Sequence, residues 1–552
     1  MATVAEVVLR RRDDDNVGLR SADVDGSSWT WREVVQESAV RAAVLRSLRR
    51  DGPFHVGVLL GNVPEYVFLL GAAALEGAAI VGINPTRRGA ELAADIRHTD
   101  CQLIVTDRRQ AELLAGLDLG LPADRVLVVE DRAWISLLDE HVGAPPPEAR
   151  LPGPDALFVL IFTSGSSGAP KAVRATQGRI GAMADLGFSP DDVLYCSMPL
   201  FHGNALASNL LPGMGAGATI VLRSRFSASG FLPDARRFGV TYFNTVGRAL
   251  SYILATPSSA DDRDHRIAFA IAPESSARDI AEFEARFGVT VVEGYGSSEG
   301  AIRLFPVRRQ LPGALGRPEA GVDIAVIDPA TGRECPPARH DGEGRLLNSG
   351  EAIGELVRRD AGADATFEGY YENPEATAER LRNGWFWSGD LAYRDADGVF
   401  YFAGRTIDWL RVDGENFAAA PVERIVGRHP DVAAVAVYSV PDPRTGDQVM
   451  MAVELRDGTT FDPEGFARFL AEQADLGPKW WPRFVRVTPG LPMTATNKIA
   501  KPALRHEAWQ TPDPVWWRPE PGSSYTRLTP DAATGLAAEF ASHGRQRLLP
   551  QP

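Results

Sequence analysis

The segment from Ile161 to Lys171 combines hydroxyl, glycine and lysine residues directly after the apolar run Ala156–Leu160, and its loop holds Thr163, Ser164, Gly165, Ser166, Ser167 and Gly168. Glycines let backbone N–H groups approach an anion closely, hydroxyls add donors, and Lys171 adds a positive charge. The segment lacks the Gly-Lys-Ser/Thr ending of a Walker A loop, and Pro170 precedes its lysine. We therefore predict a phosphate-binding loop of another kind; a flexible surface loop is the alternative.

Further residues with possible chemistry follow at wide intervals: His202 in Pro199–His202, Glu299 in Gly294–Gly300, Asp390 in Gly384–Asp390, Arg405 after Gly404, and Lys498 in Thr494–Lys498. Taken singly, each also has a structural interpretation. Glu299 could be an acid at the start of a helix, and Asp390 a turn residue. His202 could be a packed turn residue, and Lys498 an ordinary surface lysine.

The order of these segments resembles the adenylate-forming superfamily, which contains acyl-CoA synthetases, luciferases and the adenylation domains of peptide synthetases. The resemblance covers roughly residues 20 to 505 and includes Gly316-Arg-Pro318. Three further segments, 84–92, 245–252 and 405–416, look most like the fatty-acid-transport-protein branch. That branch contains very-long-chain acyl-CoA synthetases, including the FadD-type enzymes of actinobacteria.

The resemblance implies that a carboxylate attacks the α-phosphate of ATP, giving an acyl-adenylate and pyrophosphate, and that coenzyme A then displaces AMP. Negative charge gathers at phosphorus, so magnesium and fixed cations would carry most of the catalysis. Glu299 would bind Mg²⁺ with Thr163 as second ligand, because magnesium prefers hard oxygen ligands. Lys498 would bridge the acyl carboxylate and the α-phosphate, as a compact charge on a long stem can do.

The resemblance also assigns the contacts to nucleotide and thiol. Tyr295 would stack on adenine, and the backbone of Ala272-Pro273 would flank the ring. Gly296 and Ser298 belong to the same motif as Tyr295. Asp390 would bind the ribose hydroxyls, with Arg405 nearby, and the loop 163–168 with Lys171 would hold the phosphates. His202 would lie near the acyl group and the thiol entrance, with a gating role. Arg411 and Gly414 would face the pantetheine tunnel.

Some residues depart from the family pattern. Ile407 stands where the pivot between two domain poses usually has Asp, Lys or Gly. A β-branched residue is stiffer, so the pivot could shift to Asp408. Ser167 and Ser298 keep the hydroxyl of the more common Thr, and Asn497 can adopt the geometry of the usual Gly.

Apolar segments of helix length and of strand length alternate along the first three hundred residues, as in Pro64–Gly77, Ala78–Ile83, Gly89–His98 and Cys101–Thr106. This pattern predicts βαβ units and an α/β fold with parallel-type sheets, whose ligands bind at the carboxyl ends of the strands. We expect a large N-terminal body of several subdomains over residues 1–404. A small, mobile α+β domain carrying Lys498 would span 405–510, with 432–440 and 448–454 paired as strands. Residues 511–552, with Trp516-Trp517, would form a partly docked tail.

Composition limits the function classes. The chain of 552 residues has a formal net charge of −14, which argues against nucleic acid as a partner. Cys101, Cys196 and Cys335 have no metal-binding or disulfide spacing, and the N-terminus lacks the apolar core of a signal peptide, so we expect a cytoplasmic protein. The apolar region 55–84 is interrupted too often to span a membrane, although peripheral contact stays open. We expect a monomer or homodimer.

The leading hypothesis is therefore an ATP-dependent ligase that joins a fatty or other hydrophobic acid to coenzyme A. A second hypothesis keeps the adenylation but changes the partners to an aryl acid, a carrier-protein thiol, or nitrite with an arylamine in diazotisation. The third is a catalytically inactive nucleotide-binding protein. The joint presence of Glu299, Asp390, Arg405 and Lys498 counts against the third.

Overall fold

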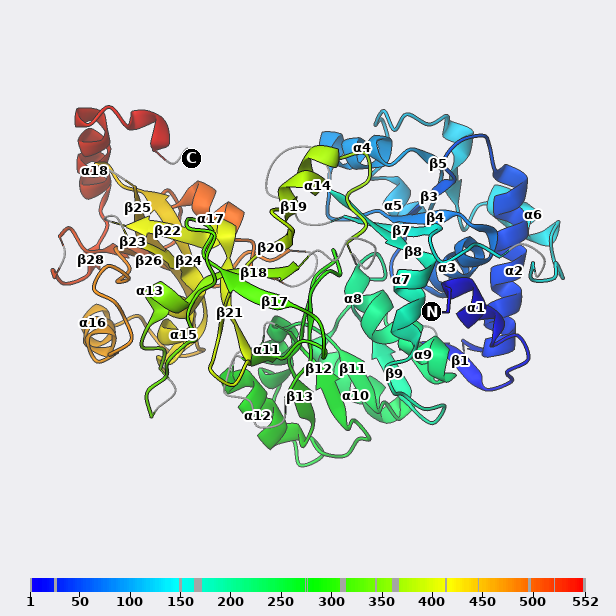
Figure 1. Ribbon diagram of the computed structural model, residues 1–552, viewed down its shortest axis with the longest axis horizontal. Coiled ribbons are helices and arrows are strands. Elements are labelled where there is room, and N and C mark those ends of the chain that lie inside the picture. The colour runs from blue at the N-terminus through cyan, green and yellow to red at the C-terminus, as the bar shows by residue number, and fades with distance from the viewer. Residues whose placement is uncertain are drawn as a thin grey trace. The chain divides into compact units, whose positions relative to one another are not determined.

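The computed structural model (Figure 1) describes residues 2–549 except 24–26, 148–150, 163–170, 274, 276, 308–313, 343–344, 360–366, 413–414, 445, 495–497 and 521. Contacts divide the chain into two compact units. The N-terminal unit comprises Met1–Arg303 and Asp360–Gly384, and the C-terminal unit comprises Leu304–Arg359 and Trp385–Pro552. The domain boundaries expected from the sequence, at residues 404 and 510, concern separately folded domains and stay predictions.

One sheet of the N-terminal unit has the strand order β6-β5-β3-β4-β7-β8, parallel except that β8 runs antiparallel to β7. The strands are β3 (His55–Leu59), β4 (Ala79–Gly82), β5 (Cys101–Thr106), β6 (Val126–Val128), β7 (Leu157–Phe162) and β8 (Ala172–Thr176). The associated helices are α2 (Trp31–Leu48), α3 (Pro64–Glu76), α4 (Gly89–His98), α5 (Arg108–Ala111) and α6 (Arg132–Asp139). Local sequence explains several ends: Pro64 starts α3, and Gly77 ends it with φ 74°.

The second sheet of this unit has the order β13-β12-β11-β9-β10-β1-β2, and only its edge strand β2 is antiparallel to its neighbour among the pairs described. The strands are β1 (Val17–Ser21), β2 (Ser28–Thr30), β9 (Val193–Cys196), β10 (Thr219–Leu222), β11 (Tyr242–Asn244), β12 (Phe269–Ile271) and β13 (Thr290–Val292). Helices α10 (Ala228–Phe238), α11 (Gly247–Leu254) and α12 (Ala277–Phe287) lie beside it in Figure 1. Phe231, Leu250 and Phe283 bring these helices into one buried apolar cluster with the sheet.

The remaining elements of the N-terminal unit are short. They are α1 (Val4–Leu9), η1 (Ala123–Arg125), α7 (Gln177–Gly181), η2 (Ala182–Ala184), α8 (Gly203–Ala205), the π-helical turn η3 (Leu206–Leu210), α9 (Leu211–Ala216), β14 (Tyr295–Gly296), α14 (Pro374–Arg380) and β19 (Leu381–Arg382). β15 (Arg303–Leu304) lies where the chain passes into the other unit.

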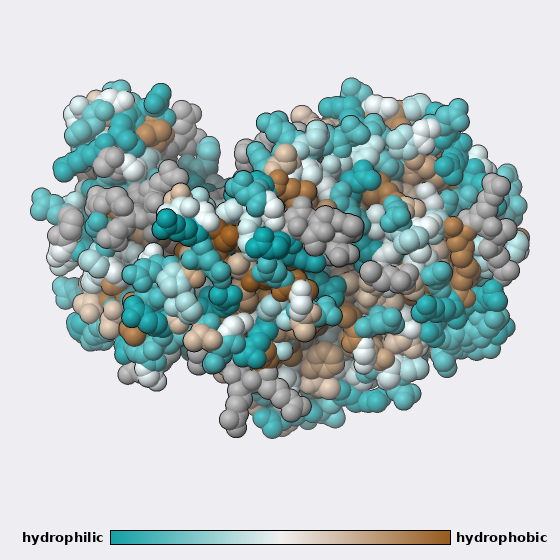
Figure 2. Space-filling model, viewed as in Figure 1, coloured by the Kyte–Doolittle hydropathy of each residue, from teal (hydrophilic) through white to brown (hydrophobic). Residues whose placement is uncertain are grey.

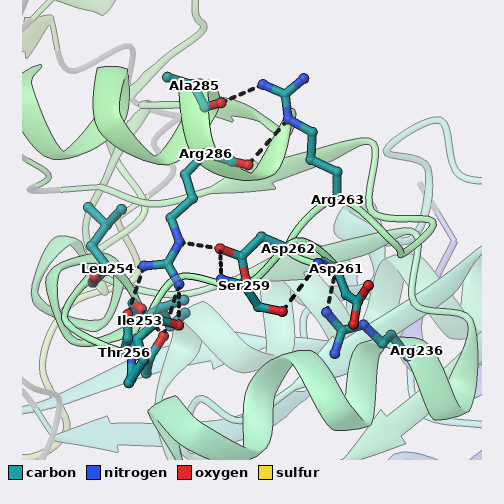
Figure 3. Close-up of polar contacts among 11 residues, drawn as sticks. Arg236, Ile253, Leu254, Thr256, Ser259, Asp261, Asp262, Arg263, Ala285 and Arg286 are labelled. Atoms are coloured by element: carbon teal, nitrogen blue, oxygen red, sulfur yellow. Dashed lines mark hydrogen bonds and ion pairs between the residues drawn. The ribbon is translucent and has the colours of Figure 1, made fainter.

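An arginine-centred cluster fixes the connection between α11 and β12 (Figure 3). Arg286, at the end of α12, donates to Asp262 Oδ2 at 2.7 Å and to the carbonyls of Leu254 and Thr256 at 2.8 and 2.9 Å. Arg236 of α10 donates to the carbonyl of Asp261 at 2.6 Å. Hydrogen bonds to charged groups are stronger than neutral ones, so this loop is tied to two helices.

The C-terminal unit contains a sheet whose strands within the unit run β16-β21-β20-β18-β17. They are β16 (Ala314–Gly316), β17 (Ile324–Ile327), β18 (Gly354–Arg359), β20 (Trp385–Arg394) and β21 (Phe400–Arg405), with α13 (Ser349–Ala352) between β17 and β18. After the turn η5 (Thr406–Asp408) comes the hairpin β22 (Trp409–Val412) and β23 (Glu415–Ala418).

A second sheet of this unit has the order β24-β25-β26-β27-β28. It comprises β24 (Val432–Pro441), β25 (Asp447–Leu455), β26 (Phe484–Val487), β27 (Val515–Trp517) and β28 (Thr526–Arg527), with helices α15 (Ala419–Val426), α16 (Pro463–Ala471), α17 (Lys501–Glu507) and α18 (Pro530–Ser542). The predicted pairing of 432–440 with 448–454 is present as β24 and β25. Residues 511–549 are integrated more fully than the sequence predicts, because β27 pairs with β26 and Phe540 of α18 is fully buried.

Polar residues cover most of the face seen in Figure 2, with apolar residues in small groups. No helix within the described part of the chain is long and apolar enough to cross a membrane. Cys101, Cys196 and Cys335 are buried and form no disulfide bonds. Burial raises the thiol pKa of Cys101 and Cys196 to about 12 and that of Cys335 to about 11, so these side chains are thiols rather than thiolates.

Candidate active site

The predicted nucleotide residues of the N-terminal unit gather at the carboxyl ends of parallel strands, where α/β sheets bind ligands. The loop that begins after Phe162 follows β7, and the predicted residues Thr163, Ser164, Gly165, Ser166, Ser167 and Gly168 lie outside the described residues. Lys171 directly precedes β8. Its Nζ lies 5.9 Å from the centre of the Tyr370 ring and 3.9 Å from Glu379 Oε2.

Tyr370 links the lysine to the predicted metal ligand. Its hydroxyl donates to Glu299 Oε1 at 2.8 Å and accepts from Arg380 Nε at 3.3 Å. Glu299 and Tyr370 are both buried. Burial, followed by the charge of Glu299, raises the pKa of Tyr370 above its usual range, so the phenol stays a donor. One oxygen of Glu299 is thereby engaged by a neutral hydroxyl.

The turn that carries Glu299 rests on a partly buried arginine. Arg179 Nη2 donates to the carbonyl of Ser298 at 2.5 Å and Nη1 to that of Arg174 at 2.8 Å. Burial lowers the pKa of Arg179, an effect that the charges of Glu368 and Glu299 oppose. A Cβ at Gly300 would lie 2.3 Å from Arg179 Nη2, and Gly300 has φ +68°. Glycine is therefore required at this position by both close approach and backbone conformation.

The predicted adenine contacts follow β12 and β13. Ala272 N–H donates to the carbonyl of Val292 at 3.0 Å, which ties the ends of these strands together, and Gly247 N–H donates to the carbonyl of Pro273 at 2.9 Å. Tyr295 and Gly296 come three residues after β13 and form β14. A Cβ at Gly296 would meet no atom within 4 Å, so there is open space beside that backbone.

His202 follows β9 and precedes α8. A Cβ at Gly203 would lie 3.3 Å from Ile161 Cδ1, which places this turn against the end of β7. The buried amide of Asn62 supports the preceding loop, because its Nδ2 donates to the carbonyl of Met198 at 2.8 Å and its Oδ1 accepts from Leu200 N–H at 2.9 Å. The turn that holds His202 thus lies beside the end of β7.

A chain of amides continues from this turn into the interior. Asn209 Nδ2 donates to the carbonyl of Tyr195 at 3.0 Å and to Asn244 Oδ1 at 2.8 Å, and Asn244 Nδ2 donates to Asn204 Oδ1 at 2.6 Å. Asn209 lies in the π-helical turn η3, a type of distortion often found at functional sites. The polar chain thus ties the turn after His202 to β9 and β11.

The C-terminal unit carries the predicted ribose contacts on neighbouring strands. Asp390 on β20 is opposite Arg405 on β21, with 3.6 Å between Asp390 Oδ1 and Arg405 Nε. Gly389, at φ +77°, donates its N–H to Glu355 Oε1 at 2.8 Å and accepts at its carbonyl from Thr406 Oγ1 at 3.0 Å. These bonds fix the turn that presents Asp390.

Lys498 lies in a narrow turn of the same unit. Thr494 N–H donates to the Lys498 carbonyl at 2.7 Å, Lys498 N–H donates to Thr494 Oγ1 at 3.1 Å, and Met493 and Ile499 form an antiparallel bridge. The backbone of Arg411 belongs to β22, but its side chain lies outside the described residues, as does Gly414. The part of the chain that the structure describes contains no group of three or more His, Cys, Asp or Glu side chains suited to a metal ion.

Comparison with known proteins identifies the family. A model described as "AMP-binding enzyme" matches residues 7–371, and one described as "AMP-binding enzyme C-terminal domain" matches residues 421–498. The chain belongs to the AMP-binding enzyme family.

Its relatives include CoA ligases of actinobacteria. Steroid-22-oyl-CoA synthetase of Rhodococcus jostii (strain RHA1) is 53% identical over 557 residues, 99% of each chain. Medium/long-chain-fatty-acid–CoA ligase FadD17 of Mycobacterium tuberculosis (strain ATCC 25618 / H37Rv) is 44% identical over 522 residues, 93% of this chain and 98% of the relative. The anthranilate CoA ligase AuaEII in complex with anthranoyl-AMP has the same fold, with TM-score 0.78 and 22% identity over 91% of this chain and 96% of that one.

These findings confirm the predicted superfamily, the α/β fold class and the predicted AMP-forming acid–CoA ligase activity. ATP and coenzyme A are accordingly its nucleotide and thiol substrates. The family models do not assign individual residues in this AMP-binding enzyme, so the roles of Lys498, Glu299 and the other predicted residues remain proposals.

Sequence reasoning missed Tyr370, Arg179, Asn62 and Glu355. Each acts through contacts with a segment that is distant in the chain; Tyr370 and Glu299, for example, are 71 positions apart. No periodicity or local motif reports such a contact. A signal was available for Tyr370, because an aromatic pair, Tyr370-Tyr371, ends the region that the AMP-binding family model matches.

Proposed function

We propose that the acid substrate of this ligase is a large hydrophobic acid with a steroid nucleus, activated at its side-chain carboxylate. The supporting observation is the 53% identity with Steroid-22-oyl-CoA synthetase, which extends over 99% of both chains. Each CH₂ group buried in an apolar pocket contributes about 0.8 kcal/mol, so a polycyclic acid can be selected by apolar contact alone. A medium- or long-chain fatty acid is the second candidate, favoured by the 44% identity with FadD17.

The chemistry proposed for each residue follows from its charge and surroundings. Glu299, one of whose oxygens is engaged by Tyr370, offers a hard carboxylate oxygen to Mg²⁺, and the substrate phosphates and water complete the coordination as is usual for this ion. Thr163 is the proposed second protein ligand. The bound ion would offset charge on the phosphates. The hydroxyl loop 163–168 and Lys171 bind phosphate oxygens.

Adenine stacks on Tyr295 beside Ala272 and Pro273, and Gly296 and Ser298 belong to the same contact. Asp390 accepts from the ribose hydroxyls, with Arg405 beside it. His202 lies at the acyl and thiol entrance, and Arg411 and Gly414 contact pantetheine. These assignments rest on the family resemblance and on the position of the described residues at strand ends.

Lys498 acts in adenylation by neutralising the charge that develops between carboxylate and α-phosphate. Lys498→Ala should therefore lower acid-dependent pyrophosphate exchange by about 100- to 1,000-fold, the usual loss when one preorganised donor is removed from a transition state. ATP affinity, measured by calorimetry, should change little. Unchanged exchange in this variant would contradict the role of Lys498.

The substrate is tested by a pyrophosphate-release screen of the purified chain with a C22 steroid acid, dodecanoate, palmitate, benzoate and nitrite plus an arylamine. Each acid is assayed with and without coenzyme A, and the CoA ester is detected by mass spectrometry. We expect the highest kcat/KM with the steroid acid, and a CoA ester only when coenzyme A is present. Faster turnover of dodecanoate or palmitate would favour the second candidate, and product from nitrite would contradict both.

A further inference from the structure

The C-terminal unit contains a partly buried ion cluster whose lysine, Lys501, is close in sequence to Lys498. Lys501 Nζ lies 2.9 Å from Glu423 Oε1 and 3.3 Å from Asp408 Oδ2, and Arg505 Nη2 lies 3.0 Å from Asp408 Oδ1. Asp408 is only 8% exposed, and the Lys501 side chain is 17% exposed. Two cations and two carboxylates therefore meet around the buried Asp408, with Glu423 and Arg505 partly exposed.

The cluster connects three elements. Asp408 ends η5, three residues after Arg405 at the end of β21. Glu423 belongs to α15, and its Oε1 also accepts from Val437 N–H of β24 at 2.7 Å. Lys501 and Arg505 both belong to α17. These ion pairs thus connect the segment after Arg405 with α15 and with the start of α17.

Lys501 is the first residue of α17, three positions after Lys498. Three extended residues span at most about 10 Å, so an anchor at Lys501 limits where Lys498 can lie. Ala500 N–H donates to the carbonyl of Pro492 at 2.7 Å, and Met493 pairs with Ile499. The segments on either side of Lys498 are consequently bonded to each other, and Lys501 attaches the C-terminal one to the cluster.

Charge keeps Lys501 in this place. Burial alone would lower the pKa of Lys501, but the carboxylates of Glu423 and Asp408 outweigh that effect and raise it. The ammonium group therefore stays charged at neutral pH and cannot leave its partners without exposing buried carboxylates. Breaking such a pair is costly because the remaining charge is uncompensated.

We propose that Lys501, held by Glu423 and Asp408, is a positioning residue that sets the place of Lys498 for adenylation. This inference rests on the proposed role of Lys498. Because Lys498 is proposed to act in adenylation, we expect the cluster to serve the first half-reaction rather than the second. Asp408, three residues after Arg405, also ties the end of β21 to the cluster.

The test separates the two half-reactions in the full chain. Adenylation is followed by pyrophosphate exchange with dodecanoate or the steroid acid, whichever the wild type converts faster. Thioester formation is followed in single turnover from the preformed adenylate of that acid plus coenzyme A. Lys501→Met should lower exchange by about 100-fold, as a misplacement of about 1 Å can, while thioester formation stays within about twofold. Lys501→Arg should restore most of the exchange.

Two further variants keep the outcome decisive if Lys501→Met folds poorly. Lys501→Met with Glu423→Gln removes one charge of each sign, leaves Asp408 paired with Arg505, and should show the same split between half-reactions. Lys501→Met added to Lys498→Ala should cause no further loss of exchange, because the residue acts through Lys498. Asp442→Asn is the matched control: Asp442 is 7% exposed, pairs with Arg483 and accepts hydrogen bonds from Arg444 N–H and Gln448 Nε2.

Equal loss of both half-reactions, or a further loss on the Lys498→Ala background, would overturn the inference and indicate a general role in folding. Exchange that is unaffected by Lys501→Met would also overturn it. Absence of exchange in the wild-type chain with every acid would instead contradict the proposed function.

Discussion

At the scale of single residues, the contact between Tyr370 and Glu299 is the clearest addition to what the motifs predicted. The phenol donates to one carboxylate oxygen in a buried setting and is itself oriented by Arg380. A hydrogen bond to a charged group contributes about 1.5–3 kcal/mol, enough to determine how the carboxylate is turned. We expect the other oxygen of Glu299 to be the one that meets the metal.

Tyr370→Phe should therefore weaken the use of magnesium. The carboxylate loses its donor and can rotate, so we expect the Mg²⁺ concentration for half-maximal pyrophosphate exchange to rise, and exchange at fixed Mg²⁺ to fall by about 10- to 100-fold. Mg²⁺–ATP binding measured by calorimetry should weaken in parallel.

Tyr371→Phe is the matched control for this prediction. The neighbouring phenol of Tyr371 donates to a different carboxylate, Asp100 Oδ2, at 2.8 Å. This variant should keep the wild-type dependence on Mg²⁺. If both variants behave alike, the effect belongs to the packing of the 367–371 segment and not to Glu299.

At the scale of elements, sequence patterns predicted the bounds of helices and strands well where contacts between residues close in sequence determine them. The predicted helix Gly89–His98 and strand Cys101–Thr106 have the predicted bounds. The predicted strand 266–271 is shorter, because β12 includes only Phe269–Ile271. Its first residues belong to the loop that Arg236 and Arg286 hold, and these arginines come from two other helices.

The site shows the same limit. Motifs identified Lys171, Glu299, Asp390, Arg405 and Lys498, because hydroxyls, glycines and charges at fixed spacing carry a local signal. Lys501 and Asp408 are 93 residues apart, and their pairing depends on how η5 and α17 fold together. The alternation of helices and strands predicts the sheets, but it gives no information about side chains that meet across such distances.

Asp262→Asn tests the arginine cluster that fixes the loop between α11 and β12. The hydrogen bond from Arg286, ahead of the other contacts, lowers the pKa of Asp262. A carboxylate with a lowered pKa stabilises the fold above the unfolded value of about 3.9, and that stabilisation is lost as pH falls through the folded value. The melting temperature of the variant should be lower than that of the wild type at pH 7, and the difference should shrink toward pH 3.

The exposed neighbour gives a control for this experiment. Asp264 contributes its carbonyl to Arg236, and its side chain is exposed. Asp264→Asn should leave the melting temperature and its pH dependence close to wild type. A constant difference between Asp262→Asn and wild type across this pH range would show that the lost stability does not come from the ionised carboxylate.

At the scale of the whole molecule, the C-terminal helix α18 belongs to the buried cluster beside Lys498, the residue proposed to act in adenylation. Leu536 and Phe540 of α18 share one buried cluster with Leu491 and Leu504, which flank the Lys498 turn on either side. Phe484 stacks on Trp509 with 4.8 Å between ring centres in the same cluster. The Pro-, Gly- and Ser-rich composition after residue 511 predicted a tail, because the turn residues there outweigh the signal of α18, in which only Leu536 and Phe540 are buried.

Phe540→Ala should therefore cost about 3–5 kcal/mol of unfolding free energy, the range for removing a buried aromatic ring. The ring fills the space between α18 and the β-sheet, so its loss loosens the cluster that includes both flanks of Lys498. Urea unfolding should detect this loss, and pyrophosphate exchange should fail at a lower temperature than in the wild type. Leu548→Ala, at a residue 39% exposed, should change the free energy by less than about 0.5 kcal/mol. Equal stability of the two variants would mean that residues 530–549 lie outside the cooperative core, and that adenylation does not depend on them.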